Sequence, residues 1–189
     1  MDEKFRNLDF DPRKLPRDYL EAIGLACACY AQTEDHLQMA IAGLLKIDSE
    51  TGWAVTTHMT APLRESVLKS LSDMKFDDLA EIEAFDIHLA DVAEAGDRRN
   101  SIVHHMWCTD EQTGEVFQVR TKARTRVAVE LTPISLESIQ NDAKFIYDAG
   151  IELLRFLLTR NLIPALPARG RARFDKRKAI KANKKKSVG

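Results

Sequence analysis

The sequence predicts a mainly α-helical protein, an up-and-down four-helix bundle with a β-hairpin inserted before its last helix. Three observations predict this fold. Over long stretches, apolar residues recur at steps of three and four, which places their side chains on one face of a helix. Between about residues 107 and 131, apolar and polar residues alternate instead, which is the period of a strand. Turn or capping residues separate these stretches, as at residues 110–114 and at Thr132-Pro133.

The first and last long helices are expected over about residues 16–47 and 133–163. Pro16 and Pro133 suit a first helical turn, where the missing N–H leaves no hydrogen bond unmade. Two shorter helices are expected near residues 50–58 and 62–74. The apolar seam of the first helix consists of Leu20, Ile23, Cys27, Tyr30, Glu34, Leu37, Ile41 and Leu44, and that of the last consists of Leu136, Ile139, Ala143, Ile146, Gly150, Leu153 and Leu157. Glu34 is the one charged member of its seam.

A further long helix is expected over about residues 77–107. Its seam consists of Ile82, Phe85, Leu89, Val92, Gly96, Arg99, Val103 and Met106. Arg99 therefore falls on the stripe that should be buried, and Gly96 leaves open space one turn earlier. Because charges are almost never fully buried unless they are paired, we predict that Arg99 meets the carboxylate of Glu34.

The predicted hairpin pairs residues 117–121 with residues 127–131. Phe117, Val119 and Thr121 alternate with Gln118 and Arg120 in its first strand. Residues near 107–109 are expected to add a third strand.

Length and charge suggest a helical domain over residues 16–168, between an N-terminal extension of residues 1–15 and a basic tail of residues 169–189. The net charge of −1 hides an asymmetry, because ten lysines and arginines and one aspartate lie between Arg169 and Lys186. The tail is expected to be disordered. We favour its interpretation as a nucleic-acid tether over a merely solubilising extension. Its candidate contacts are Arg169, Arg171, Arg173, Lys176, Arg177, Lys178, Lys184, Lys185 and Lys186.

Composition indicates a cytoplasmic protein. The three cysteines have no disulfide-framework spacing, which favours reduced thiols. The first residues lack the apolar core of a secretory signal, and no apolar run could span a bilayer, so no membrane partner is expected. His36, His58 and His88 show no metal-ligand spacing, and we expect neither a metal nor a cofactor.

The run from Arg99 to His104, Arg-Asn-Ser-Ile-Val-His, resembles the motif of the HEPN superfamily, an Arg and a polar residue followed by a His after four intervening residues. With Trp107 three residues further on, it is similar to a bacterial branch with an RN-x-[LIV]-V-H pattern. That branch often has Gly after the His, where this chain has His105. The resemblance covers about residues 16–163.

This resemblance implies a metal-independent endoribonuclease, because many HEPN domains have that activity in toxin–antitoxin, abortive-infection and CRISPR-associated systems. Such domains commonly dimerise so that two motifs form one composite site. The resemblance therefore implies RNA as substrate, a homodimer, and an antitoxin or regulatory protein as a further partner.

The chemistry of the motif suits RNA cleavage. A histidine side chain can act as acid or base near neutrality, and His104 supplies one. The guanidinium of Arg99 matches phosphate oxygens, and Asn100, four residues before His104, shares its helix face. Arg99 and His104 lie about 140° apart at roughly 100° per residue. Either the arginine side chain bends round, or a second subunit completes the site. Glu34 would hold Arg99, and we expect His105 to be an exposed neighbour.

Two other interpretations remain open. The chain could be a non-catalytic HEPN-like bundle that binds nucleotide, RNA or a protein partner. It could also be a structural interaction module, in which Arg99 and Glu34 form only a buried ion pair and His104 packs at the helix end.

Overall fold

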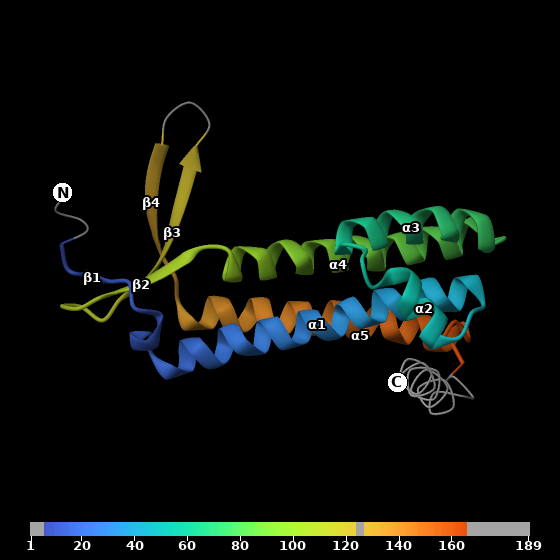
Figure 1. Cartoon of the computed structure of the whole chain (residues 1–189), viewed down its shortest axis with the longest axis horizontal. Coiled ribbons are helices and arrows are strands. Elements are labelled where there is room, and N and C mark those ends of the chain that lie inside the picture. The colour runs from blue at the N-terminus through green and yellow to red at the C-terminus, as the bar shows by residue number, and fades with distance from the viewer. Residues whose placement is uncertain (1–5, 124–126, 166–189) are drawn as a thin grey trace, which may run out of the picture. The chain divides into compact units, whose positions relative to one another are not determined.

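The computed structural model describes residues 6–123 and 127–165. These residues form a mainly helical protein with a small antiparallel sheet, which confirms the predicted class (Figure 1). The helices are α1 (Arg17–Leu45), α2 (Ser49–Thr56), α3 (Ala61–Lys75), α4 (Leu79–Val103) and α5 (Leu136–Thr159). The strands are β1 (Leu8–Asp9), β2 (Met106–Asp110), β3 (Val116–Ala123) and β4 (Val127–Pro133), and a 3-10 helix, η2, spans Pro12–Lys14.

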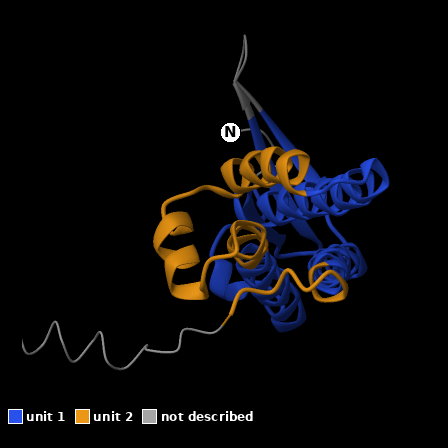
Figure 2. Ribbon diagram, turned by 90° about the vertical axis from the view of Figure 1, so that its right-hand side faces the viewer, with its two compact units in different colours: residues 1–36, 76–156 blue, residues 37–75, 157–189 orange. Residues whose placement is uncertain are grey.

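The chain divides into two compact units, drawn in different colours in Figure 2. Unit 1 consists of residues 1–36 and 76–156, and it contains the first part of α1, the whole of α4, the sheet and most of α5. Unit 2 consists of residues 37–75 and 157–189. The predicted basic tail of residues 169–189 lies outside the described residues.

In unit 1, α1, α4 and α5 pack against one another through small residues and aromatic rings. A Cβ atom at Gly96 would lie 2.7 Å from the hydroxyl of Tyr30, so the glycine lets α4 approach that ring. The ring centroids of Phe85 and Phe156 lie 5.2 Å apart between α4 and α5. These contacts build the helical part of the unit that carries the motif.

The predicted seam of α5 is confirmed, but that of α1 begins on a different face. From Ile139 to Leu157, every predicted seam position of α5 is buried. In α1, Leu20 is 41% exposed and Ile23, Cys27 and Glu34 are only half-buried. Tyr30 is buried as predicted, and the other buried residues in the unit 1 part of α1 are Ala22, Ala26, Cys29, Thr33 and His36, which lie outside the predicted seam. Small residues rather than the larger aliphatic ones face the neighbouring helices, which moves Glu34 to the edge of the seam.

The sheet of unit 1 has the order β1-β2-β3-β4, with all neighbours antiparallel. The predicted hairpin is confirmed as β3 and β4, and the predicted third strand near residues 107–109 as β2, but residues 117–121 pair with residues 129–133 rather than 127–131. Thr132 and Pro133, predicted to start the last helix, therefore lie in β4, and α5 begins at Leu136. Met106, expected at the end of the α4 seam, instead begins β2 and is 54% exposed. Strand β1 comes from the segment predicted as an N-terminal extension, where Leu8 pairs with Asp110.

Unit 2 contains the last turns of α1, followed by α2 and α3 at the positions that the sequence predicts. The carboxylate of Asp48 caps α2 by accepting hydrogen bonds from the backbone N–H and the hydroxyl of Thr51. A Cβ atom at Gly43 would lie 1.7 Å from the carbonyl oxygen of Leu162, so only glycine fits there. Among the described helices, none is both long and apolar enough to cross a membrane.

Candidate functional site

The motif lies at the C-terminal end of α4, where side chains from the sheet form hydrogen bonds with the last backbone carbonyls of the helix. The last carbonyls of a helix lack backbone partners within it. Here Gln118 of β3 donates from Nε2 to the carbonyl oxygen of Ser101 at 3.0 Å, and Trp107 of β2 donates from Nε1 to that of Ile102 at 2.9 Å. Strands β2 and β3 therefore hold the end of the motif helix in place.

His104 is the C-cap residue of α4, and its side chain is exposed. Its backbone N–H donates to the carbonyl oxygen of Asn100 at 3.0 Å, so the helical geometry continues through His104. Asn100 is also exposed and, four residues earlier, shares the face of His104. The sequence predicts this shared face, and the helix extends far enough to keep it.

Arg99 turns toward the face of Asn100. Its Nη1 donates to the carboxamide oxygen Oδ1 of Asn100 at 3.1 Å. Its guanidinium carbon lies 5.6 Å from the centroid of the Tyr30 ring, and its Nε is buried with no hydrogen-bond partner in the described part of the chain. Two of the three predicted catalytic residues are thus in direct contact.

The predicted ion pair of Arg99 with Glu34 is wrong. Among the described residues, the neighbours of the Arg99 guanidinium are Asn100 and the Tyr30 ring, and no carboxylate lies within 4.0 Å of it. The reason is the close approach at Gly96, which brings the ring of Tyr30 to α4, whereas Glu34 lies half-buried at the edge of the α1 seam with contacts of its own.

A second arginine reaches the motif from β3. Nη2 of Arg120 donates to the hydroxyl of Ser101 at 3.2 Å and lies 3.5 Å from Oε1 of Gln118. Its Nε is buried and has no hydrogen-bond partner within residues 6–123 and 127–165. Sequence reasoning missed Arg120, Gln118 and Tyr30 as parts of this site. Alternation alone assigns Gln118 and Arg120 to the polar side of a strand and carries no signal that they contact α4.

His105 is half-buried rather than an exposed neighbour, so that expectation is wrong. Its Nδ1 lies 2.7 Å from the carbonyl oxygen of Ser101, to which it donates as the protonated ring nitrogen. This carbonyl therefore receives donors from both His105 and Gln118. His105 acts as a capping side chain for α4.

Arg98, next to Arg99 in sequence, has a different environment. It forms ion pairs with Glu94 at 2.5 Å and with Asp142 at 3.0 Å, and its guanidinium lies 3.9 Å above the centroid of the Phe145 ring. These contacts make Arg98 a structural link between α4 and α5. Of the two adjacent arginines, only Arg98 is neutralised by carboxylates in the described part of the chain.

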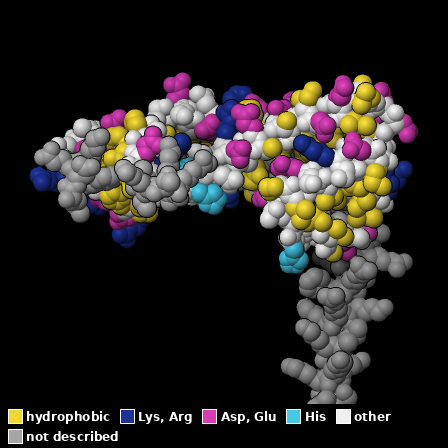
Figure 3. Space-filling model, turned by 90° about the horizontal axis from the view of Figure 1, so that it is seen from above, with side chains coloured by type: hydrophobic (Ala, Val, Ile, Leu, Met, Phe, Trp, Pro, Cys, Tyr) yellow, Lys and Arg dark blue, Asp and Glu magenta, His cyan; other side chains and the backbone are white. Residues whose placement is uncertain are grey.

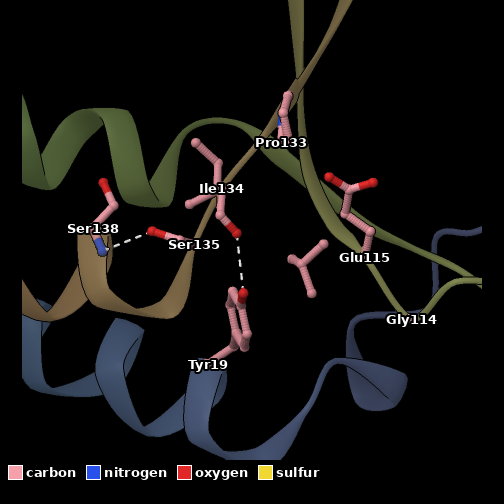
Figure 4. Close-up of a pocket in the computed structure, with 8 residues that line it drawn as sticks. Tyr19, Gly114, Glu115, Pro133, Ile134, Ser135 and Ser138 are labelled. Atoms are coloured by element: carbon pink, nitrogen blue, oxygen red, sulfur yellow. Dashed lines mark hydrogen bonds between the residues drawn. The ribbon is translucent and has the colours of Figure 1, made fainter.

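A hollow of about 540 Å³ lies elsewhere in unit 1, between the start of α1, the β2–β3 turn and the start of α5 (Figure 4). The Tyr19 hydroxyl donates to the carbonyl oxygen of Ile134 at 3.0 Å, and the Ser135 hydroxyl accepts from the Ser138 backbone N–H. These bonds tie the hollow's polar groups to the backbone. None of the motif residues lines it.

The histidines, cysteines and carboxylates of residues 6–123 and 127–165 include no group of three or more that could hold a metal ion. Cys27, Cys29 and Cys108 are free thiols, and burial raises the pKa of Cys29 and of Cys108. On the face drawn in Figure 3, acidic side chains are spread among apolar and neutral ones, and histidine side chains reach the surface. The predicted nucleic-acid contacts from Arg169 to Lys186 lie outside the described residues.

Comparison with known proteins identifies no relative, so the site is interpreted from its geometry alone. No protein-family model, no curated protein and no solved structure matches this chain.

Proposed function

We propose that this protein is a metal-independent endoribonuclease of the HEPN type, acting in the cytoplasm as a toxin or phage-defence effector. One observation carries the proposal. An exposed histidine, His104, shares a helix face with Asn100, and the carboxamide of Asn100 is held by Arg99, whose guanidinium has no carboxylate partner among the described residues. This arrangement offers an acid or base beside an available positive charge.

The missing carboxylate supports a phosphate as the natural partner of Arg99. A partly buried cation without a counter-ion is costly, and an anionic ligand would offset that cost. A guanidinium presents its N–H donors in a planar fork that matches two phosphate oxygens. The same fork would neutralise the charge that develops on the phosphate during cleavage.

In the proposed reaction, a base removes the proton of a ribose 2′-hydroxyl, whose oxygen attacks the adjacent phosphorus. The bond from phosphorus to the 5′-oxygen breaks, and an acid protonates that oxygen. The products are a 2′,3′-cyclic phosphate and a 5′-hydroxyl. His104 serves as base or acid, Arg99 stabilises the pentacoordinate phosphate, and Asn100 positions the imidazole or the substrate.

The proposal includes a homodimer, because one imidazole cannot easily be both acid and base in the same step. The neighbouring His105 is committed through its Nδ1 to the carbonyl oxygen of Ser101. A second subunit would supply the second His104. We further propose that the fold is an up-and-down four-helix bundle and that an antitoxin or regulatory protein controls the activity. The apolar seams support the bundle, and the resemblance of the motif suggests the regulator.

Incubation of the purified protein with RNA tests the activity, with Arg99→Ala and His104→Ala as the variants. We expect fragments that end in cyclic phosphates, and their loss in both variants while the thermal unfolding midpoint is retained. Binding of RNA without cleavage by the unmodified protein would favour the non-catalytic alternative instead.

A further inference from the structure

Arg120 is a cation that the proposed chemistry leaves unexplained. It is half-buried on β3, and its buried Nε has no hydrogen-bond partner among the residues that the structure describes. Within the described residues, no carboxylate lies within 4.0 Å of its guanidinium. Unsatisfied buried donors are rare in folded proteins, and a charged one calls for a specific reason.

The nearest acidic residue in the strand pairing does not neutralise Arg120. Glu130 of β4 lies directly opposite Arg120 in the register, which is where a cross-strand ion pair would form. The guanidinium turns instead toward α4, where Nη2 donates to the hydroxyl of Ser101 at 3.2 Å. Its polar contacts among the described residues are therefore the neutral hydroxyl of Ser101 and carboxamide oxygen of Gln118, which position the cation without neutralising its charge.

This contact places Arg120 beside the catalytic face. Around α4, at roughly 100° per residue, Asn100 lies about 100° from Arg99, His104 about 140° and Ser101 about 200°. Asn100 and His104 thus form a strip between Arg99 on one side and Ser101 on the other. Because Arg120 is anchored at Ser101, the two uncompensated guanidinium groups flank the strip that carries the proposed acid or base.

We propose that Arg120 is a second phosphate-binding residue of the Arg99–His104 site and holds an RNA phosphate adjacent to the one at which the strand is cleaved. This inference rests on the proposed function for the identity of the cleaved phosphate. An RNA strand carries a phosphate on each side of every nucleotide, so a cation on each flank of His104 would align the strand across it. Arg120 would contribute to substrate binding, and Arg99 to stabilisation of the reacting phosphate.

The test is the binding of a fluorescently labelled 2′-O-methyl oligoribonucleotide, which cannot be cleaved, by the full-length protein over a range of salt concentrations. For Arg120→Gln we expect about tenfold weaker binding and a salt slope reduced by about 0.7, the value for one phosphate contact on a single strand. Arg120→Lys should keep the slope, because it keeps the charge. Arg98→Gln is the matched control, since two carboxylates already neutralise Arg98, and binding should stay within about twofold.

An unchanged salt slope in folded Arg120→Gln overturns the inference. If Arg120→Gln does not fold, Arg120→Lys provides the test. A reduced salt slope in Arg120→Lys would overturn the inference, because lysine retains the positive charge to which the inference assigns the phosphate contact. Cleavage of unmodified RNA by the wild-type protein is scored separately. If the wild-type protein cleaves RNA but its binding does not depend on Arg120, only this inference is overturned. If binding depends on Arg120 but no RNA is cleaved, only the proposed nuclease activity is overturned. A wild-type protein that neither binds nor cleaves RNA overturns both.

Discussion

In unit 1, the buried polar groups between α1 and α5 differ in their hydrogen bonding from those at the end of α4. Between α1 and α5, the Thr33 hydroxyl donates to the carbonyl oxygen of Cys29 at 3.0 Å, and Nδ1 of His36 lies 2.9 Å from that of Gly150. Both side chains are buried, and both are satisfied by backbone carbonyls. At the end of α4, by contrast, the Nε atoms of Arg99 and Arg120 are buried and have no hydrogen-bond partner among the described residues.

Under the proposed function, the difference separates polar groups that only hold the fold together from those that bind phosphate. A buried hydroxyl or imidazole that bonds a carbonyl contributes to the uniqueness of helix packing and leaves nothing for a substrate to bind. A guanidinium without a counter-ion destabilises the free protein and is suited to bind an anion. Changes between α1 and α5 should therefore alter stability, whereas changes at the end of α4 should alter activity.

The largest expected effect is on catalysis, from His104→Ala. Loss of a general acid or base typically reduces the rate by about 10² to 10⁴-fold. The side chain is exposed at the helix end, so the thermal unfolding midpoint should change little. Cleavage of a fluorogenic RNA oligonucleotide measures the rate. His58, an exposed histidine of unit 2, supplies the control variant His58→Ala, and equal activity of the two variants would remove His104 from the mechanism.

The next effect is on stability, from Gly150→Ala in the packed part of unit 1. A Cβ atom at this position would lie 2.4 Å from Oγ1 of Thr33, a buried, hydrogen-bonded and β-branched side chain that cannot rotate away. We expect a loss of about 1–3 kcal/mol in the free energy of unfolding, as for other overpacked cores. Urea denaturation provides the measurement.

Gly24→Ala is the matched control for that substitution. Gly24 also lies in a helix, but a Cβ atom there would meet nothing within 4 Å. The better helix propensity of alanine should stabilise the protein by up to about 1 kcal/mol. If both variants shift stability in the same direction, close packing at Gly150 does not explain the glycine.

Sequence periodicity predicts the helices and the hairpin because burial of apolar side chains repeats along each element. It also places Asn100 and His104 on one face, since that relation depends only on helix geometry. It fails for Glu34, because the face of α1 that is buried depends on small residues whose pattern is weak. Ala22 and Ala26 are buried, whereas the larger Leu20 is exposed.

The partners of the motif could not be predicted for a different reason. Gln118 and Arg120 reach α4 from a strand that follows it by more than ten residues, and their contacts depend on how β3 lies against the helix end. No local pattern encodes that placement. The close approach of Tyr30 depends on Gly96 in the same way, and the sequence shows only the open space that the glycine leaves.

A smaller effect should appear as a pH dependence of stability. Burial lowers the pKa of His36 below its ordinary value, although its hydrogen bond to the Gly150 carbonyl and the nearby Asp35 oppose the shift. In the unfolded state the His36 imidazole is therefore protonated near pH 6.5, whereas in the folded state it is protonated only at a lower pH. The contribution of neutral His36 is complete above about pH 6.5 and is lost as the pH falls from there toward the lowered pKa.

The expected slope is at most about 1.4 kcal/mol per pH unit, the value for one proton. Urea denaturation between pH 8 and pH 5 measures it, and His36→Gln should flatten the curve in this window. If the difference between wild type and variant does not change with pH, His36 does not titrate differently in the folded state.

The smallest effect should come from Trp107→Phe, which removes one capping donor from the end of α4. The indole N–H is bonded to the carbonyl oxygen of Ile102 at 2.9 Å, and phenylalanine keeps most of the apolar contact but leaves that carbonyl without this partner. A net loss of about 1 kcal/mol in the free energy of unfolding is expected for one such hydrogen bond. Trp53→Phe, at a tryptophan that is 54% exposed, should cost less. Because Trp107 is bonded to a carbonyl of the motif itself, its loss should also slow cleavage by more than the same change at Trp53. Equal cleavage rates would show that the cap holds α4 without aligning His104.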